Sequence, residues 1–467
     1  MLSDAARTAV SDGGYDFAAL RAREFARLDA QGHAYLDYAA TALYGASQLR
    51  AHHARLADSV LGNPHSESRP SRTAGALIEL ARHQVLAWFD VDESTHDVCF
   101  TANASAALKL VAESYPFGPR AALVLAADNH NSVNGAREYA RRAGAAVRVL
   151  PLDAELRLAD PEAHLVDQAA HGGGLVAFPA QSNFSGVRHP LALVARARGL
   201  GFEVLLDIAA FAPGQALSLR ACPADFAALS FHKLFGYPTS VGALIARRDA
   251  LARLHRPWFA GGTVAFVSIG ADLHRLHGGH EGFEDGTADF LGIAALAPGF
   301  ALLGEVGMSR LAMHVKLLTG QLLDGLTSLR HTGGGPLVRL YGPQAGVHGI
   351  AAMFDRGSTV TINVMDARGR PIPYSVVEAR ARDAGVALRG GCFCNPGAAE
   401  AAFGLDADRV VACMAALGDE FSPTRLADCA DRAIGGVRLS LGLANDQRDV
   451  ERAIAVIASF AAPAKSD

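Results

Sequence analysis

The chain has 467 residues, of which half are hydrophobic and 19% are charged, and its formal net charge at pH 7 is -4. A net charge this small for the length gives no basis for a nucleic-acid or polyanion partner, so small-molecule chemistry is the better expectation. At about 150 residues per domain, the length predicts two or three packed units.

The opening stretch "MLSDAARTAV" lacks a basic segment followed by an apolar core. We also find no uninterrupted apolar run of the ~18 residues that a membrane span requires, so we expect a cytoplasmic protein with no membrane partner. Six cysteines are too sparse for a disulfide scaffold in a chain of this length. We therefore expect reduced thiols.

From about residue 75 to 245, apolar β-type runs alternate with helical patterns rich in Ala, Leu and Arg. Strands that alternate with helices predict βαβ units and an α/β fold built on a large, mostly parallel sheet. The predicted strands are "DVCFTA", "AALVLAAD", "AAVRVLPL", "GLVAFPA", "EVLLDIAAF", "AALSF" and "GALIARRD". Functional groups should then lie just past the carboxyl ends of these strands.

After about residue 300 the pattern changes to a long helical stretch, the strand "STVTINVMD", a helix from about Tyr374, and the strand "GVRLSLG". This pattern predicts a smaller C-terminal α/β domain packed with the N-terminal segment. We place the large domain at residues 1–300 and the small domain at 301–467.

Four loops after predicted strands carry different polar groups. "FTANASAALKLVAE" leads into a helix through small residues, which either lets backbone N–H groups reach a phosphate or forms an ordinary N-cap. His130 in "NHNSV" and Asn183 in "FPAQSNFSG" are, taken alone, ordinary loop residues. Asp207 interrupts the apolar run "EVLLDIAAF", where a carboxylate is costly unless a cation pairs with it or it caps the strand end.

The fifth stretch, "SFHKLFGYPT", places Lys233 among apolar and aromatic residues directly after His232. Such a lysine either extends its amine to water or keeps it in a pocket, where burial favours the neutral, nucleophilic form. A lysine, a buried aspartate, a stacking-capable histidine and a phosphate-sized helix start are together what pyridoxal phosphate requires.

With these residues in view, the sequence resembles the aminotransferase class V group of fold-type I pyridoxal-phosphate enzymes. Within this group it is most similar to cysteine desulfurases, and in particular to the N-terminal desulfurase domain of molybdenum cofactor sulfurases. The stretches that carry the resemblance are "YLDYAATALY", "GNPHS", "FTANASAALKLVAE", "PAQSNFSGVRHPL", "LLDIAAF", "SFHKLFGYPTSVGALI", "FEDGTADFL", "LRGGCFCNPGA" and "GVRLSLG". They run from Tyr35 to beyond Gly442 and so cover nearly the whole chain.

The resemblance implies a homodimer that binds pyridoxal phosphate and L-cysteine. It makes Lys233 the Schiff-base lysine, Asp207 the partner of the ring nitrogen, His130 the residue stacked on the ring, and Asn183 a contact of the ring hydroxyl. The residues implied to hold the phosphate are Ala104, Ser105, Ser230 and His232, joined by Gly286 and Thr287 from the other subunit. Arg438 would bind the substrate carboxylate, and Arg389 is a second candidate for a similar role.

The "CFC" stretch carries the remaining chemistry. A thiol on a mobile, glycine-flanked loop after an arginine could ionise readily and move to a bound substrate. Alignment on that arginine makes Cys394 the nucleophile that forms a persulfide, with Cys392 second. A zinc site is a weaker alternative because no matching second cluster of ligands is visible, and we expect no metal.

The sequence thus predicts a cysteine desulfurase that releases alanine and holds the sulfur as a persulfide for transfer to an acceptor. A pyridoxal-phosphate lyase or aminotransferase that uses neither cysteine remains an alternative, as does a non-catalytic sulfur carrier or scaffold. We expect no second, cofactor-handling domain after the small domain, and the resemblance therefore leaves the sulfur acceptor open.

Overall fold

The computed structural model describes residues 14–343 and 355–461. Its centre is a seven-stranded sheet in the order β2-β8-β7-β6-β5-β3-β4, in which β8 alone runs antiparallel to its neighbours. The strands are β2 (His96–Thr101), β3 (Ala122–Ala126), β4 (Val147–Leu150), β5 (Gly174–Pro179), β6 (Phe202–Asp207), β7 (Phe226–Ser230) and β8 (Gly242–Arg247). Each of the seven predicted apolar runs forms one of these strands, so the predicted α/β class and mostly parallel sheet are confirmed.

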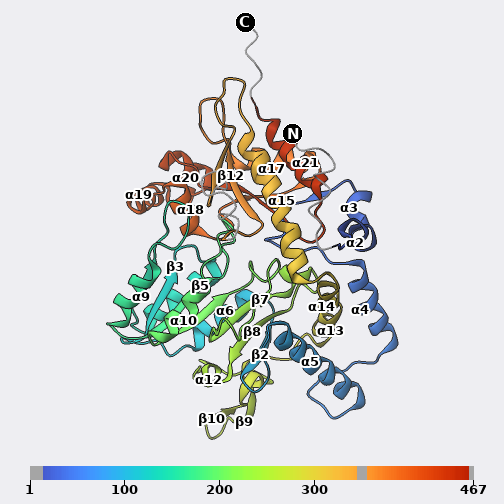
Figure 1. Cartoon of the computed structure of the whole chain (residues 1–467). Helices are drawn as coiled ribbons and strands as arrows, with labels where there is room; N and C mark the ends of the chain where they lie inside the picture. The colour runs from blue at the N-terminus through green and yellow to red at the C-terminus, as the bar shows by residue number, and fades with distance from the viewer. Residues whose placement is uncertain (1–13, 344–354, 462–467) are drawn as a thin grey trace.

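Helices cover both faces of the sheet (Figure 1), and its strands are almost wholly buried except for the edge strand β4, where Arg148 and Val149 are exposed. Successive residues of β3, such as Val124 and Leu125, belong to different hydrophobic clusters, because side chains alternate between the two faces of a strand. Helices α5 (Arg69–Trp88) and α10 (Ala192–Gly199) contribute to one cluster, and α6 (Ala104–Ser114) contributes to the other. Burial on both faces explains why these strands read as continuous apolar runs.

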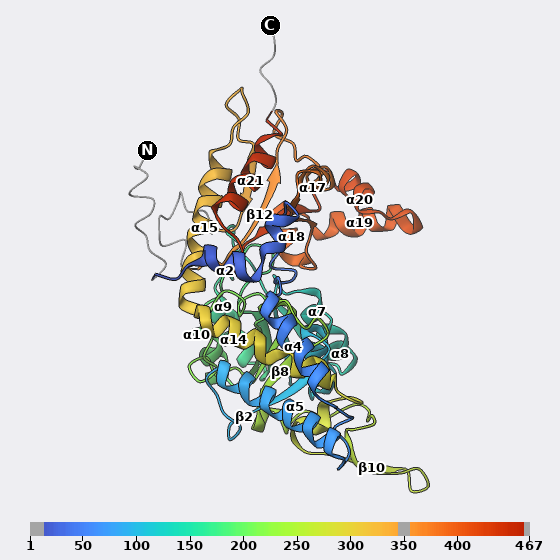
Figure 2. The ribbon, with the colours of Figure 1, turned by 90° about the vertical axis from the view of Figure 1, so that its right-hand side faces the viewer.

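The small domain has a four-stranded sheet in the order β11-β12-β15-β14. These strands are β11 (Val338–Tyr341), β12 (Thr359–Val364), β15 (Gly436–Ser440) and β14 (Arg389–Gly391). Helices α15 (Met308–Ser328), α17 (Tyr374–Asp383) and α21 (Gln447–Ala458) lie beside this sheet (Figure 2) and share a third hydrophobic cluster with it.

The N-terminal segment packs against the small domain, as predicted. Strand β1 (Ala34–Tyr35) pairs in parallel with β13 (Val386–Ala387). Figure 2 shows this segment crossing beside the small domain before the chain enters the large one. The division at residue 300 stays a prediction.

Shorter elements complete the described part of the chain. They are α2 (Phe17–Glu24), α3 (Ala26–Ala30), α4 (Ala46–Asp58), α7 (Asn131–Asn134), α8 (Ala136–Arg142), α9 (Pro161–Ala169), α11 (Phe231–Phe235), α12 (Arg248–Leu251), β9 (Val264–Ser268), β10 (Leu273–Leu276), η1 (Gly279–Phe283), α13 (Phe290–Ala294), α14 (Leu296–Val306), α18 (Pro396–Phe403), α19 (Ala407–Leu417), η3 (Gly418–Glu420) and α20 (Pro423–Ala430). Within the described ranges, no single helix is long and apolar enough to cross a membrane; Phe290–Val306 and Met308–Ser328 pass that test together, but they are bent by 71°.

The expectation of reduced thiols is wrong for one pair of cysteines. Cys413 on α19 and Cys429 on α20 form a disulfide across the pair of helices. Their Cα atoms lie 5.9 Å apart, within the range that a disulfide bridges without backbone movement. The two residues are 16 positions apart in the sequence. They meet because α19 and α20 pack against each other, and these two helices were not predicted as separate elements.

Candidate functional site

Polar residues from the ends of β5, β6 and β7 and from the starts of α6 and α7 line one cavity of about 260 Å³. Parallel strands end at the same edge of the sheet, so loops far apart in sequence converge there. Eight residues of the predicted site line this cavity: Ala104, Ser105, His130, Asn183, Asp207, Ser230, His232 and Lys233. The cavity is therefore the candidate cofactor pocket.

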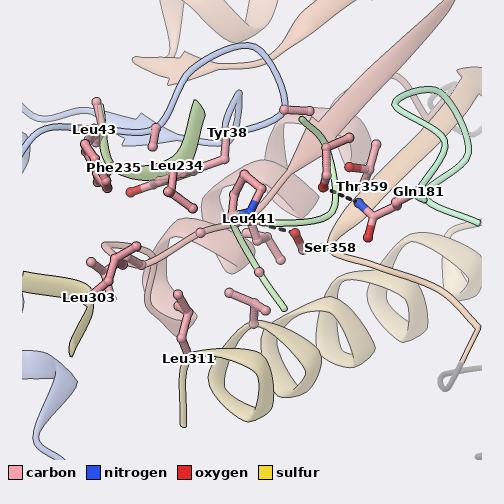
Figure 3. A pocket seen from close by; sticks show the side chains of 18 of the residues that line it. Tyr38, Leu43, Gln181, Leu234, Phe235, Leu303, Leu311, Ser358, Thr359 and Leu441 are labelled. Carbon is pink, nitrogen blue, oxygen red and sulfur yellow. Dashed lines mark hydrogen bonds between the residues drawn. The ribbon is translucent and has the colours of Figure 1, made fainter. Parts of the chain in front are cut away.

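Lys233 lies on α11, the short helix that follows β7 directly. The next two residues, Leu234 and Phe235, are buried and line a small apolar cavity of about 40 Å³ beside the main pocket (Figure 3). The apolar run around the lysine thus fastens α11 to the core. His232 and Lys233 line the polar pocket, which explains why a lysine stands in an apolar stretch.

Burial controls the charge state of the groups around Lys233. Burial lowers the pKa of the Lys233 amine, and the nearby Asp207 carboxylate opposes that shift. Burial also lowers the pKa of His130, and the Lys233 charge lowers it further. Both effects favour a neutral imidazole and a more readily deprotonated amine.

The structure also fixes His130 locally. Its Nδ1 accepts a hydrogen bond from the Ser132 backbone N–H at 3.1 Å, so that His130 forms the N-cap of α7. An acceptor at Nδ1 leaves Nε2 to carry the proton of the neutral ring. The ring is therefore held in one orientation at the edge of the pocket.

The start of α6 is joined to the end of β7. Ala104 donates its backbone N–H to Ser230 Oγ at 2.7 Å, and Asn103 caps the helix by accepting from Ala106 N at 3.0 Å. Ser105 and Ser132 lie 2.6 Å apart through their hydroxyl oxygens. His232 Nδ1 is buried without a hydrogen-bond partner among the described residues. An unpartnered buried donor or acceptor beside a helix N-terminus suits an anion.

The cysteine loop of the small domain lies beside the pocket, because Asn183, which lines the pocket, contacts both this loop and Arg438. Cys394 is exposed, and it is not among the residues that line the cavity. Cys392 is half-buried and packs against the cluster that contains Phe184. The two thiols of the "CFC" stretch therefore have different surroundings.

Amide groups of the large domain and of the loop itself form hydrogen bonds to this loop, and its mobility stays a prediction. Asn183 Nδ2 donates to Phe393 O at 2.8 Å, and Asn131 N donates to Cys394 O at 2.7 Å. Asn395 Nδ2 donates to Asp128 O at 2.7 Å and to Asn183 Oδ1 at 2.9 Å. Asn183 was expected to contact the cofactor ring, but its amide has both groups engaged with the loop.

The backbone of the loop is itself unusual. Phe393 and Cys394 have consecutive φ values of 58° and 55°, a left-handed conformation that costs non-glycine residues about 1 kcal/mol or more each. Phe393 is buried, with its ring 5.5 Å from that of Phe184. Such a conformation persists only where its surroundings determine it, so the packing and the amide contacts together fix Cys394.

The two predicted carboxylate-binding arginines lie side by side on neighbouring strands. Arg389 on β14 and Arg438 on β15 are direct partners in the antiparallel pair. Asp37 contacts both: its carboxylate is 2.7 Å from Arg389 Nη2 and 3.2 Å from Arg438 Nη2. Burial lowers the pKa of Arg438, whereas the Asp37 contact raises that of Arg389.

Gly286 and Thr287 do not line the cavity of their own chain. Both are exposed, and Thr287 Oγ1 accepts a hydrogen bond from Asn63 Nδ2 at 3.2 Å. Their predicted contact with the phosphate is therefore one that a single chain does not make. Their place in the site stays a prediction.

The sequence analysis missed three residues of the site. Asn395 and Asp37 lie within the stretches "CFCNPGA" and "YLDYAATALY", but their spacing alone gave them no role. Gln181 lines both the main pocket and the small cavity in Figure 3, donates to Ala210 O at 2.9 Å and accepts from Arg188 Nε at 3.3 Å. The one signal in the sequence for Gln181 was its position two residues before the predicted site residue Asn183.

Curated relatives resemble the chain over most of its length. The chain is 35% identical over 491 residues to a molybdenum cofactor sulfurase of Arabidopsis thaliana, covering 97% of this chain and 59% of that protein. It is 38% identical over 447 residues to one of Anopheles gambiae, covering 91% of this chain and 56% of that protein. The chain thus spans less than two thirds of the length of these relatives.

Among solved structures, the fold is similar to a cysteine desulfurase of Thermococcus onnurineus, with a TM-score of 0.76 and 23% identity over 95% of this chain and 97% of that one. The family model for aminotransferase class-V matches residues 34–453, which includes every residue placed in the site above. The chain therefore belongs to the aminotransferase class-V family.

Proposed function

We propose that the protein is a pyridoxal-phosphate-dependent cysteine desulfurase, which releases alanine from L-cysteine and keeps the sulfur on Cys394 for transfer. The observation that carries this proposal is that Asn183, which lines the same pocket as Lys233, contacts both Arg438 and the loop that bears Cys394. Its similarity to molybdenum cofactor sulfurases over more than nine tenths of the chain supports the same activity.

The residues of the pocket fit pyridoxal phosphate. When bound, this cofactor supplies an aldehyde that condenses with amines and a ring that withdraws electrons from the substrate Cα. The Lys233 amine would hold it covalently, and Asp207 would keep its ring nitrogen protonated. Its phosphate would be held by the Ser105 hydroxyl, the α6 N-terminus and His232 Nδ1, which has no hydrogen-bond partner in residues 14–343 and 355–461.

Arg438 would bind the α-carboxylate of L-cysteine, because a planar guanidinium offers a carboxylate two parallel hydrogen bonds. Its Nη1 already donates to Asn183 O at 3.1 Å, and this contact fixes the plane of the guanidinium. The low pKa of Lys233 leaves its amine able to take the proton from Cα once the substrate is bound.

Cys394 would act on the substrate sulfur. Its thiolate attacks that sulfur, a sulfur–sulfur bond forms, and the bond between sulfur and the substrate Cβ breaks. The electron pair of that bond stays with the carbon skeleton, which takes up protons and leaves as alanine. The balanced change is L-cysteine plus enzyme thiol giving L-alanine plus enzyme persulfide.

The fixed loop bears on the sulfur acceptor. Because Phe393, Cys394 and Asn395 are held by hydrogen bonds to the large domain, the persulfide would stay at the pocket. The acceptor would then come to Cys394, which is exposed. The names of the relatives make a molybdenum cofactor the first acceptor to test.

We also propose a homodimer in which Gly286 and Thr287 complete the phosphate site of the partner. Both residues are exposed, and Gly286 N donates to Gly261 O, next to a surface with many exposed apolar side chains. That surface includes Trp258, Phe259, Phe266, Val267, Ile269 and Leu273. Exposed apolar groups gathered in one region favour an interface. If light scattering finds a monomer whose sites are fully occupied by pyridoxal phosphate, the proposal is contradicted.

A cytoplasmic location also remains a proposal. Fractionation of cells that express the protein would test it. Recovery in a membrane or exported fraction would contradict it.

The activity is tested by incubating the purified, cofactor-loaded protein with L-cysteine. We expect alanine to form together with protein-bound persulfide. Formation of pyruvate and ammonia, or of sulfide with no bound persulfide at any time, would instead indicate a lyase.

A further inference from the structure

The Arg389–Arg438 pair presents an electrostatic problem that the catalytic scheme leaves unanswered. Arg389 and Arg438 are directly opposite each other on antiparallel strands, where like charges destabilise a sheet. Arg438 is 2% exposed, and a buried guanidinium without a counter-ion is costly. Some group must compensate these charges before any substrate arrives.

Asp37 is that group. It lies next to β15 through a backbone bridge with Ser440 and is 8% exposed. Arg389 holds both of its oxygens, with Nε at 3.2 Å from Oδ1 and 3.1 Å from Oδ2. Arg438 reaches the same Oδ1 at 3.2 Å. One carboxylate therefore bridges the two guanidinium groups.

The bridge leaves Arg438 with unused donors. Its Nη1 and Nη2 each have two N–H groups, of which one goes to Asn183 O and one to Asp37. Its Nε is buried with no hydrogen-bond partner among the described residues. Arg438 is thus oriented by Asp37 while part of its fork stays available to a second carboxylate.

We propose that Asp37 sets the net charge of the carboxylate site. Two arginines and one aspartate leave a net charge of +1, which matches a single α-carboxylate. When the site is empty, Asp37 compensates the charges of the two arginines. When an amino acid is bound, the Asp37 charge lowers the affinity for its carboxylate enough for the product alanine to leave. This inference rests on the proposed function, since it takes Arg438 as the group that binds the substrate carboxylate.

A purely structural role predicts a different behaviour. If Asp37 only orients the arginines, its replacement should weaken carboxylate binding, because Arg438 would lose its position. If Asp37 sets the charge, replacement by the isosteric asparagine should strengthen carboxylate binding, because the nearest negative charge is removed while a hydrogen-bond acceptor stays. The direction of the change separates the two roles.

The experiment measures the dissociation constant of L-alanine, the reaction product, from the cofactor-loaded protein by titration. Four proteins place the site at different net charges: the wild type at +1, Asp37→Asn at +2, Arg389→Gln at 0, and the double variant Asp37→Asn/Arg389→Gln again at +1. We expect Asp37→Asn to bind L-alanine on the order of tenfold more tightly than the wild type, and Arg389→Gln to bind it less tightly. The double variant should return toward the wild-type value.

Asp449→Asn is the matched control. Asp449 is 1% exposed and pairs with buried Arg21 at 2.6 Å, away from the cofactor pocket. It should lose thermal stability with no change in the L-alanine dissociation constant. Weaker binding by Asp37→Asn, or a double variant weaker than both single variants, would overturn the charge-setting role. A wild type that binds no L-alanine would instead count against the proposed function. Should Asp37→Asn not fold, tighter binding by Arg389→Gln than by the wild type would overturn the role on its own.

Discussion

The two residues that we propose to carry the chemistry, Lys233 and Cys394, are held by different means. Lys233 is placed by regular structure: it follows β7 on α11, whose apolar residues are packed into the core of the large domain. Cys394 is placed by side chains: Asn183 and Asn395 tie an irregular loop of the small domain to the large one. Apolar packing thus positions the helix, whereas hydrogen bonds from a few amides position the loop.

The difference has consequences for mutation. The lysine is positioned by many apolar contacts, so a single substitution nearby should not displace it. The cysteine depends on a few specific hydrogen bonds, and each can be removed alone. Substitutions at Lys233, at the cysteines, at Asn395 and at the disulfide test this difference, and their expected effects on turnover decrease in that order.

Replacing Lys233 with alanine should have the largest effect. The cofactor loses its covalent link and the Cα proton loses its acceptor, so alanine formation should fall by at least about 10³-fold. The visible absorption of the bound cofactor should also change. Lys109→Ala, at an exposed lysine paired with Glu113, should behave as the wild type. A wild type that takes up no pyridoxal phosphate would remove the basis of the scheme.

Replacing Cys394 with serine should abolish persulfide formation while leaving L-cysteine binding intact, because binding uses Lys233 and Arg438. Cys392→Ser should keep much of the activity, since its half-buried thiol packs against a hydrophobic cluster. Rates of alanine release by the two variants provide the measurement. Equal loss in both, or full activity in Cys394→Ser, would break the assignment.

Replacing Asn395 tests the fixed loop. Asn395→Ala removes two donated hydrogen bonds and the cap of α18, where Asn395 Oδ1 accepts from Ala398 N at 3.2 Å. We expect turnover to fall about tenfold with cofactor retention unchanged, and stability to fall by about 1–3 kcal/mol.

Asn395→Asp is the matched control, because aspartate keeps the cap but cannot donate to Asp128 O. If the donated bonds fix Cys394, this variant should lose turnover as Asn395→Ala does. Turnover at the wild-type level in Asn395→Asp would show that the cap alone matters and that the loop is not held as described.

Reduction of the Cys413–Cys429 disulfide should have the smallest effect on turnover. The bond closes a stretch of 16 residues and should contribute about 3 kcal/mol to the stability of α19 and α20. Cys429→Ser should therefore increase hydrogen exchange in these two helices and change alanine release less than twofold. A large loss of activity would link this helical pair to the site.

Much of the large domain could be predicted from the sequence, because its strands are buried on both faces and read as unbroken apolar runs. The ends of those strands then gave Asp207, Ser230 and Lys233. The packing of the N-terminal segment against the small domain could also be predicted. The strands that join them could not, because β1 and β13 have only two residues each.

The remaining features depend on contacts between distant residues. Asp37 meets Arg438 across 401 positions, and Asn183 meets Asn395 across 212. No local pattern shows that an amide will contact a distant loop, so these hydrogen bonds were not predicted from the sequence. The disulfide was missed for the same reason, since Cys413 and Cys429 lie on helices whose pairing has no signature in their spacing.

The central claim is that Cys394 receives the sulfur while it remains at the pocket. The most direct measurement is mass spectrometry of the peptide containing "CFCNPGAAE" after the loaded protein has turned over L-cysteine once. We predict one added sulfur on Cys394 and an equal amount of alanine. Alanine and free sulfide in equal amounts with no sulfur added to this peptide, or sulfur added to Cys392 alone, would contradict the account.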